Sequence, residues 1–63
     1  MGELGDLLRE ARGRKGVTSA EVEEAIRVRE TLIVALEEED YGSLPERIYT
    51  KGLLKNYARY LGL

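Results

Sequence analysis

Hydrophobic residues in the first part of the chain recur with the spacing of an α-helix. Between residues 3 and 14 they fall at i, i+3, i+4 and i+7, as Leu4, Leu7, Leu8 and Ala11, which places them on one face of a helix. The next residues, 13–16, hold two glycines with two cations between them, a composition typical of a helix C-terminus. The pattern predicts a first helix over residues 3–14 that packs through this stripe.

A second and a third helix are predicted from residues 18–40. Thr18 and Glu21 have the spacing of a capping box, so the second helix is expected to begin near Ser19. Its predicted inward residues are Val22, Ala25 and Ile26. After a short connection at residues 27–28, a third helix is predicted that ends by residue 40. Its predicted inward residues are Leu32, Ile33 and Leu36.

The last third of the chain predicts a further helical segment over residues 45–61. Pro45 suits a first helical position, because its missing N–H would have no partner there. Gly52 indicates either a junction between two short helices or a close packing contact, and we expect a break there. The predicted core stripe consists of Leu54, Tyr57, Ala58 and Leu61. No strand pattern is found, so the fold class is all-α in a single domain, residues 1–63.

Composition argues against several kinds of function. The chain has no Cys and no His, so we expect no metal site, no cofactor and no catalytic residues. The longest apolar run is Leu32–Leu36, far below the roughly 18 residues of a membrane span. The start of the chain also lacks the pattern of a signal peptide, and we expect a cytoplasmic location.

Charge is unevenly distributed along the chain. The net charge of −2 divides into +1 for residues 1–15, −6 for residues 16–40 and +3 for residues 41–63. The acidic run 37–40 is interpreted as solvated surface at the end of the third helix. The basic residues Arg47, Lys51, Lys55 and Arg59 stand four apart and would share one helix face on a continuous helix, which a break at Gly52 would divide.

A capped helix, a tight turn and a third helix form a helix-turn-helix arrangement, in which the third helix would enter the DNA major groove. The stretch "VTSAEVEEAIRVRETLIVALE", residues 17–37, resembles the lambda-repressor-like (Cro/C1-type) domains. Direct readout of bases needs Arg, Lys, Asn or Gln. The expected outward residues are Glu30, Thr31, Val34 and Glu37, with Arg29 at the start. Only Arg29 and Thr31 could contact bases, so a DNA-binding regulator is the alternative rather than the leading hypothesis.

Three further segments, "LREARGRKGVT", "LEEEDYGSLPERIY" and "GLLKNYARYLGL", resemble the cytoplasmic N-terminal domain of the RodZ family of bacterial cell-shape proteins. The resemblance implies a five-helix lambda-repressor-like domain. It also implies a fragment of a longer, membrane-anchored protein, whose transmembrane segment is absent from this chain. The partner it implies is the actin-like filament protein MreB, bound through the fourth helix and its surroundings.

Candidate partner-binding residues lie in the C-terminal segment. Tyr49, Leu53 and Tyr60 form a second apolar stripe beside the core stripe, and exposed apolar surface of this kind is typical of contact sites. The alternatives are that these side chains complete the core, or that the stripe forms a homodimer. The resemblance places Tyr49 and Leu53 at MreB-facing positions, where Leu53 departs from the frequent aromatic. Lys51 and Lys55 are candidates to meet an acidic partner surface, and the alternative is that they form an ordinary solvated helix face.

Overall fold

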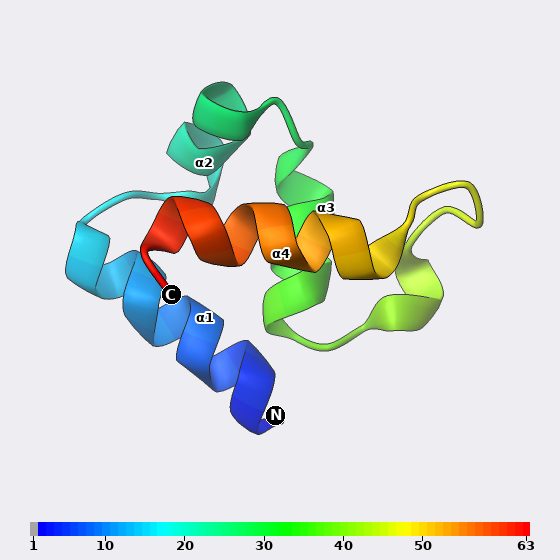
Figure 1. Cartoon of the computed structure of the whole chain (residues 1–63), viewed down its shortest axis with the longest axis horizontal. Helices are drawn as coiled ribbons and strands as arrows, with labels where there is room; N and C mark the ends of the chain where they lie inside the picture. Colours follow the sequence, from blue (N-terminus) through cyan, green and yellow to red (C-terminus); the bar gives the residue numbers. More distant parts are fainter. Residues whose placement is uncertain (1) are drawn as a thin grey trace.

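The computed structural model describes residues 2–63, which form four α-helices and one short 3₁₀ turn, with no strand among them. Figure 1 shows helix α4 passing in front of α3, with α2 above it and the C-terminal end of the chain beside α1. The elements are α1 (Glu3–Lys15), α2 (Ser19–Ile26), α3 (Glu30–Glu37), η1 (Tyr41–Ser43) and α4 (Thr50–Leu61). None of these helices is long and apolar enough to cross a membrane.

The expected fifth helix is absent. Residues 45–49 make only a turn, closed by the amide of Ile48 donating to the carbonyl of Pro45 at 3.0 Å. Leu44, which precedes the proline, has extended backbone angles, as the proline ring requires of its neighbour. Tyr49 is extended as well and serves as the N-cap of α4. Only residues 45–48 remain between the extended Leu44 and Tyr49, and this segment is too short for a separate α-helix. The prediction of five helices is therefore wrong.

Helix α1 packs through only part of the predicted stripe. Leu8 and Ala11 are buried as predicted, whereas Leu4 and Leu7 are 38% and 45% exposed and Gly5 is buried instead. The reason is the close approach of α1 to the end of α3. A Cβ atom added to Gly5 would lie 2.1 Å from the carbonyl oxygen of Glu37, so only a glycine allows this contact.

Helices α2 and α3 follow the sequence pattern closely. The capping box is confirmed, because the amide of Glu21 donates to Thr18 Oγ1 at 3.1 Å and the amide of Thr18 donates to Glu21 Oε1 at 2.8 Å. Val22 is buried as predicted, but Ala25 is exposed. Helix α2 contacts α3 and α4 along a narrow stripe that includes Val22 and Ile26, and Ala25 lies beside that stripe.

Helix α4 runs without interruption through Gly52, so the expected break there is wrong. Gly52 marks the other alternative, a close packing contact, since an added Cβ would lie 2.8 Å from Cδ2 of Tyr49. All four α-helices contribute to the centre of the core. Its fully buried side chains are Leu8, Val22, Ile33, Leu36 and Tyr57, with the predicted Leu54, Ala58 and Leu61 packed around them.

Candidate functional site

A buried polar cluster joins α1, α3 and α4. The carboxylate of Glu37, only 3% exposed, accepts hydrogen bonds from Arg12 Nε at 2.7 Å and Arg12 Nη2 at 3.1 Å. It also accepts a hydrogen bond from the hydroxyl of Tyr57. The predicted position of Glu37 on an outward, solvated face is therefore wrong: residue 37 lies one turn after the buried Ile33, on the same inward face.

The surroundings shift the pKa values of Glu37 and Tyr57 in this cluster. Burial disfavours the charged form of Glu37, but hydrogen bonds from Arg12 and Tyr57, together with the charges of Arg12 and Arg9, outweigh it and lower the Glu37 pKa. Burial and the hydrogen bond to Glu37 raise the pKa of Tyr57. At neutral pH the cluster is thus an ionised carboxylate held by a guanidinium and a neutral phenol. Every member has a partner, which makes it a part of the fold rather than a reactive site.

Two more acidic side chains bind helix N-termini. Glu39 Oε2 accepts from the amide of Gly5 at 2.8 Å, which caps α1. Glu23 Oε1 accepts from the amide of Glu30 at 2.7 Å, which caps α3. Negative charge at these positions is favourable because the N-terminal end of a helix carries partial positive charge. Within the acidic run 37–40, Glu37 and Glu39 therefore have structural roles, whereas Glu38 and Asp40 are exposed as predicted.

The N-terminal end of α3 holds both the candidate DNA-contacting residues and two carboxylates. Arg29 and Thr31 are exposed, as a base-contacting role requires. However, the carboxylates of Glu23 and Glu30 lie at the same end, the first on the Glu30 amide and the second accepting from the hydroxyl of Ser19. Both carboxylates would repel an approaching phosphate group.

Tyr49 is the most exposed large hydrophobic side chain among residues 2–63, at 72%. One part of its ring lies against Gly52 in the first turn of α4. The amide of Leu53 donates to the carbonyl of Tyr49 at 3.0 Å, which joins the backbone of Tyr49 to the helix. The rest of the ring is open to solvent and accessible to a partner.

The other members of the predicted stripe are less exposed. Leu53 and Tyr60 are half-buried and pack against the core. The ring of Tyr60 also lies 4.8 Å from Lys15 Nζ, a favourable contact between a cation and the face of an aromatic ring. The structure thus separates Tyr49, which is free to contact a partner, from two side chains that partly complete the core.

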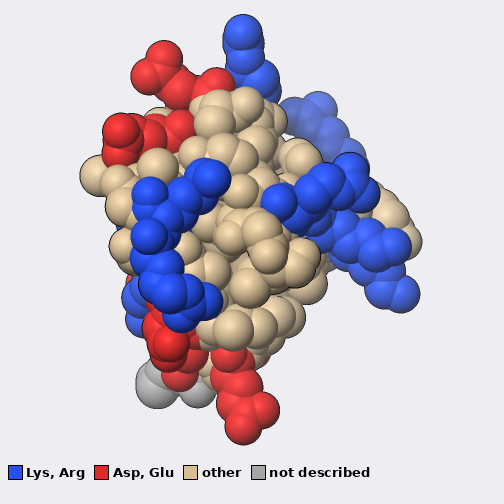
Figure 2. Space-filling view, turned by 60° about the vertical axis from the view of Figure 1, so that its left-hand side comes forward, with Lys and Arg blue, Asp and Glu red and all other residues tan. Residues whose placement is uncertain are grey.

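Lys51 and Lys55 are exposed on α4, and no carboxylate among residues 2–63 lies within 4.0 Å of either ammonium group. Because α4 begins at Thr50, these lysines and Arg59 share one unbroken helix, whereas Arg47 lies in the preceding turn. Figure 2 shows one face of the molecule on which basic side chains at the left are separated by uncharged surface from others at the right, with further basic surface at the top.

Two features of the surface and core were missed by the sequence reasoning. A signal was present for the buried cluster: Arg12 follows Leu8 by four residues and Glu37 follows Ile33 by four, so each polar residue occupies an inward helical position. No signal indicated that Arg27 and Arg29 would lie on one groove with Arg47, since that depends on how the turn before α4 folds back.

Comparison with known proteins gives one positive result. A family model described as "Helix-turn-helix domain" matches residues 7–63. No curated protein matches the chain, and neither does a solved structure. The match spans the capped α2, the turn, α3 and α4, which are the elements described above. The chain therefore belongs to the helix-turn-helix domain family.

Proposed function

We propose that this chain is a cytoplasmic adaptor domain of the RodZ type, part of a longer membrane-anchored protein, and that it binds an actin-like filament protein such as MreB. The observation that carries the proposal is Tyr49, an aromatic side chain that is 72% exposed and lies at the start of α4. Aromatic anchors of this kind dominate the binding energy of many protein interfaces. The resemblance of residues 44–63 to the RodZ family supports the same surface.

The acidic side chains at the start of α3 favour this function over DNA recognition. The end of α3 that would approach a phosphate backbone carries Glu30, and the carboxylate of Glu23 in α2 accepts from the Glu30 amide there. By contrast, the exposed side of α4 offers Tyr49 with Lys51 and Lys55. An apolar anchor beside unpaired cations suits an acidic protein surface, because the anchor supplies affinity and the charges supply orientation and association rate.

Surface plasmon resonance against MreB tests the proposal. Tyr49→Ala should weaken binding by on the order of 2 kcal/mol, mainly through faster dissociation, while the melting curve of the isolated domain stays unchanged. Tyr41→Ala is the matched control, because Tyr41 is also exposed, at 40%, but lies in η1. Lys51→Glu and Lys55→Glu should mainly slow association, and the effect should shrink as salt rises.

Two outcomes contradict the proposal. One is that the wild-type domain does not bind MreB. The other is that the Tyr49→Ala variant binds MreB as tightly as the Tyr41→Ala variant. A parallel selection from a randomised DNA duplex library covers the alternative function. Enrichment of a consensus that Arg29→Ala or Thr31→Ala abolishes would establish a DNA-binding regulator instead.

A further inference from the structure

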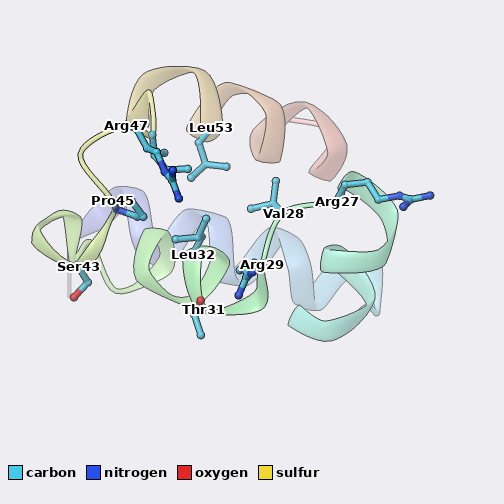
Figure 3. Close-up of a pocket in the computed structure, with 10 residues that line it drawn as sticks. Arg27, Val28, Arg29, Thr31, Leu32, Ser43, Pro45, Arg47 and Leu53 are labelled. Atoms are coloured by element: carbon cyan, nitrogen blue, oxygen red, sulfur yellow. The ribbon is translucent and has the colours of Figure 1, made fainter.

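A groove of about 590 Å³ lies between the first half of α3, the turn before α4 and the first turn of α4. Its apolar side chains come from all three segments. Figure 3 shows Val28 and Leu32 on one side and Leu53 on the other, pointing toward one another. Pro45 and Ile48 add further apolar surface from the turn. The volume is within the range of about 300–1,000 Å³ that binding sites occupy.

Arginines from two segments border this apolar surface. Arg29 stands at the start of α3 and Arg47 reaches into the groove from the turn, while Arg27 extends away from it (Figure 3). Within residues 2–63, no carboxylate lies within 4.0 Å of Arg29 or Arg47. The three arginines of α1 differ in this respect, since Arg9, Arg12 and Arg14 each have a carboxylate within that distance. The groove therefore combines unneutralised positive charge with apolar surface.

This combination restricts what can bind. A phosphate backbone would match the arginines but would gain nothing from Val28, Leu32 and Leu53. An acidic peptide with an apolar side chain satisfies both requirements, because its carboxylates can pair with the guanidinium groups while the apolar side chain leaves water.

We propose that this groove binds a short acidic peptide segment of a partner protein, with one apolar side chain on Val28, Leu32 and Leu53 and flanking carboxylates on Arg29 and Arg47. Arg29 and Thr31, which the sequence indicated as the candidate base-contacting residues, both line this groove and take part in peptide recognition instead. The inference does not depend on the identity of the filament partner. It adds a second contact next to Tyr49, which follows Ile48 directly in the chain.

The test uses the chain as it stands and a fluorescein-labelled peptide of sequence Asp-Glu-Leu-Leu-Glu-Asp, with binding followed by fluorescence anisotropy at low salt. Arg47→Glu and Arg29→Glu should each weaken binding by roughly tenfold, because an attraction becomes a repulsion. Arg14→Glu is the matched control, since Arg14 is an exposed arginine of α1 outside the groove. It should change the affinity less than about twofold.

A second peptide with both leucines replaced by serine separates apolar contact from charge attraction alone. It should bind at least about tenfold more weakly, because serine cannot replace the apolar contact that a leucine side chain makes in the groove. In addition, titration of ¹⁵N-labelled domain with the leucine peptide should shift the amide signals of Val28, Leu32 and Leu53. The amide signals of the last turn of α1, around Arg14, should not shift, because this turn lies outside the groove.

Three results overturn the inference. They are equal loss of affinity in Arg14→Glu and Arg47→Glu, equal binding of the leucine and serine peptides, and amide shifts that map outside the groove. Tighter binding of a duplex DNA probe than of the peptide, abolished by the same two arginine substitutions, would assign the groove to nucleic acid. None of these measurements includes MreB, so failure here and failure of the filament-binding proposal are distinguishable.

Discussion

Replacing Glu37 with alanine removes a carboxylate that α1, α3 and α4 share, and we expect this to be the most damaging single change to an acidic residue in the domain. The variant leaves the Tyr57 hydroxyl buried without an acceptor, which costs about 1–3 kcal/mol. It also leaves the Arg12 guanidinium without the carboxylate that accepts its two hydrogen bonds, at 2.7 and 3.1 Å.

Removing one partner of a fully buried ion pair destabilises a protein by about 3–5 kcal/mol. The lower end applies here, because the Arg12 side chain is 23% exposed and water can partly replace the lost contact. We therefore expect a loss of about 3 kcal/mol for Glu37→Ala. Domains are stable by roughly 0.05–0.15 kcal/mol per residue, so this loss is a large fraction of the total for 63 residues. Glu37→Gln keeps an acceptor for Tyr57 and should lose about half as much.

Urea unfolding followed by circular dichroism measures these differences. Glu38→Ala is the matched control, since Glu38 is the adjacent glutamate and is exposed, and it should stay within about 0.5 kcal/mol of wild type. Tyr57→Phe alone should cost about 1.5 kcal/mol, and much less when Glu37 is already alanine, because the two side chains share one hydrogen bond. A loss below about 1 kcal/mol for Glu37→Ala, or fully additive effects with Tyr57→Phe, would refute the reasoning.

Three further predictions use the same unfolding measurement. Thr18→Ala should destabilise the domain by about 1 kcal/mol, since it removes the side-chain cap of α2, and an unchanged midpoint would mean that the cap contributes nothing. Gly5→Ala should cost about 1–3 kcal/mol or more, because its Cβ would lie 2.1 Å from the Glu37 carbonyl oxygen; Gly13→Ala, with open space around it, is the control and should not destabilise. Stability should also depend on pH at both extremes. Since folding lowers the pKa of Glu37, its contribution is complete above the ordinary value of 4.5 and is lost as pH falls through the lowered pKa. Since folding raises the pKa of Tyr57 above its ordinary value of 10.0, stability falls as pH rises past that value, where only the unfolded tyrosine ionises. Glu37→Gln should flatten the acid arm and Tyr57→Phe the alkaline arm; arms that stay equally steep in these variants would contradict the assignment.

The proposed functional surface was only partly predictable. Tyr49 was identified from the sequence as a candidate contact residue, and its exposure agrees with that role. The sequence did not show that Tyr49 differs in exposure from Leu53 and Tyr60, which belong to the same stripe but pack against the core. That separation depends on where α4 begins. Because Tyr49 is the N-cap rather than an interior helical residue, its ring lies outside the packed face.

Sequence by itself determined the features that arise within a few neighbouring residues. The capping box at Thr18 and Glu21 formed as predicted, because its hydrogen bonds span only three residues. The left-handed glycine caps at Gly16 and Gly62 follow from the same local chemistry. Together with the helical spacing of apolar residues, these signals were enough to identify the all-helical helix-turn-helix arrangement.

Only the tertiary structure decided which faces of those helices meet. Leu4 and Leu7 have the same local spacing as Leu8 and Ala11, yet they stay exposed because Gly5 lets α1 approach the end of α3. Glu37 is buried because its partners Arg12 and Tyr57, 25 and 20 residues away along the chain, converge on it. Burying a carboxylate is unfavourable until such donors surround it, and no local pattern records where distant donors will lie.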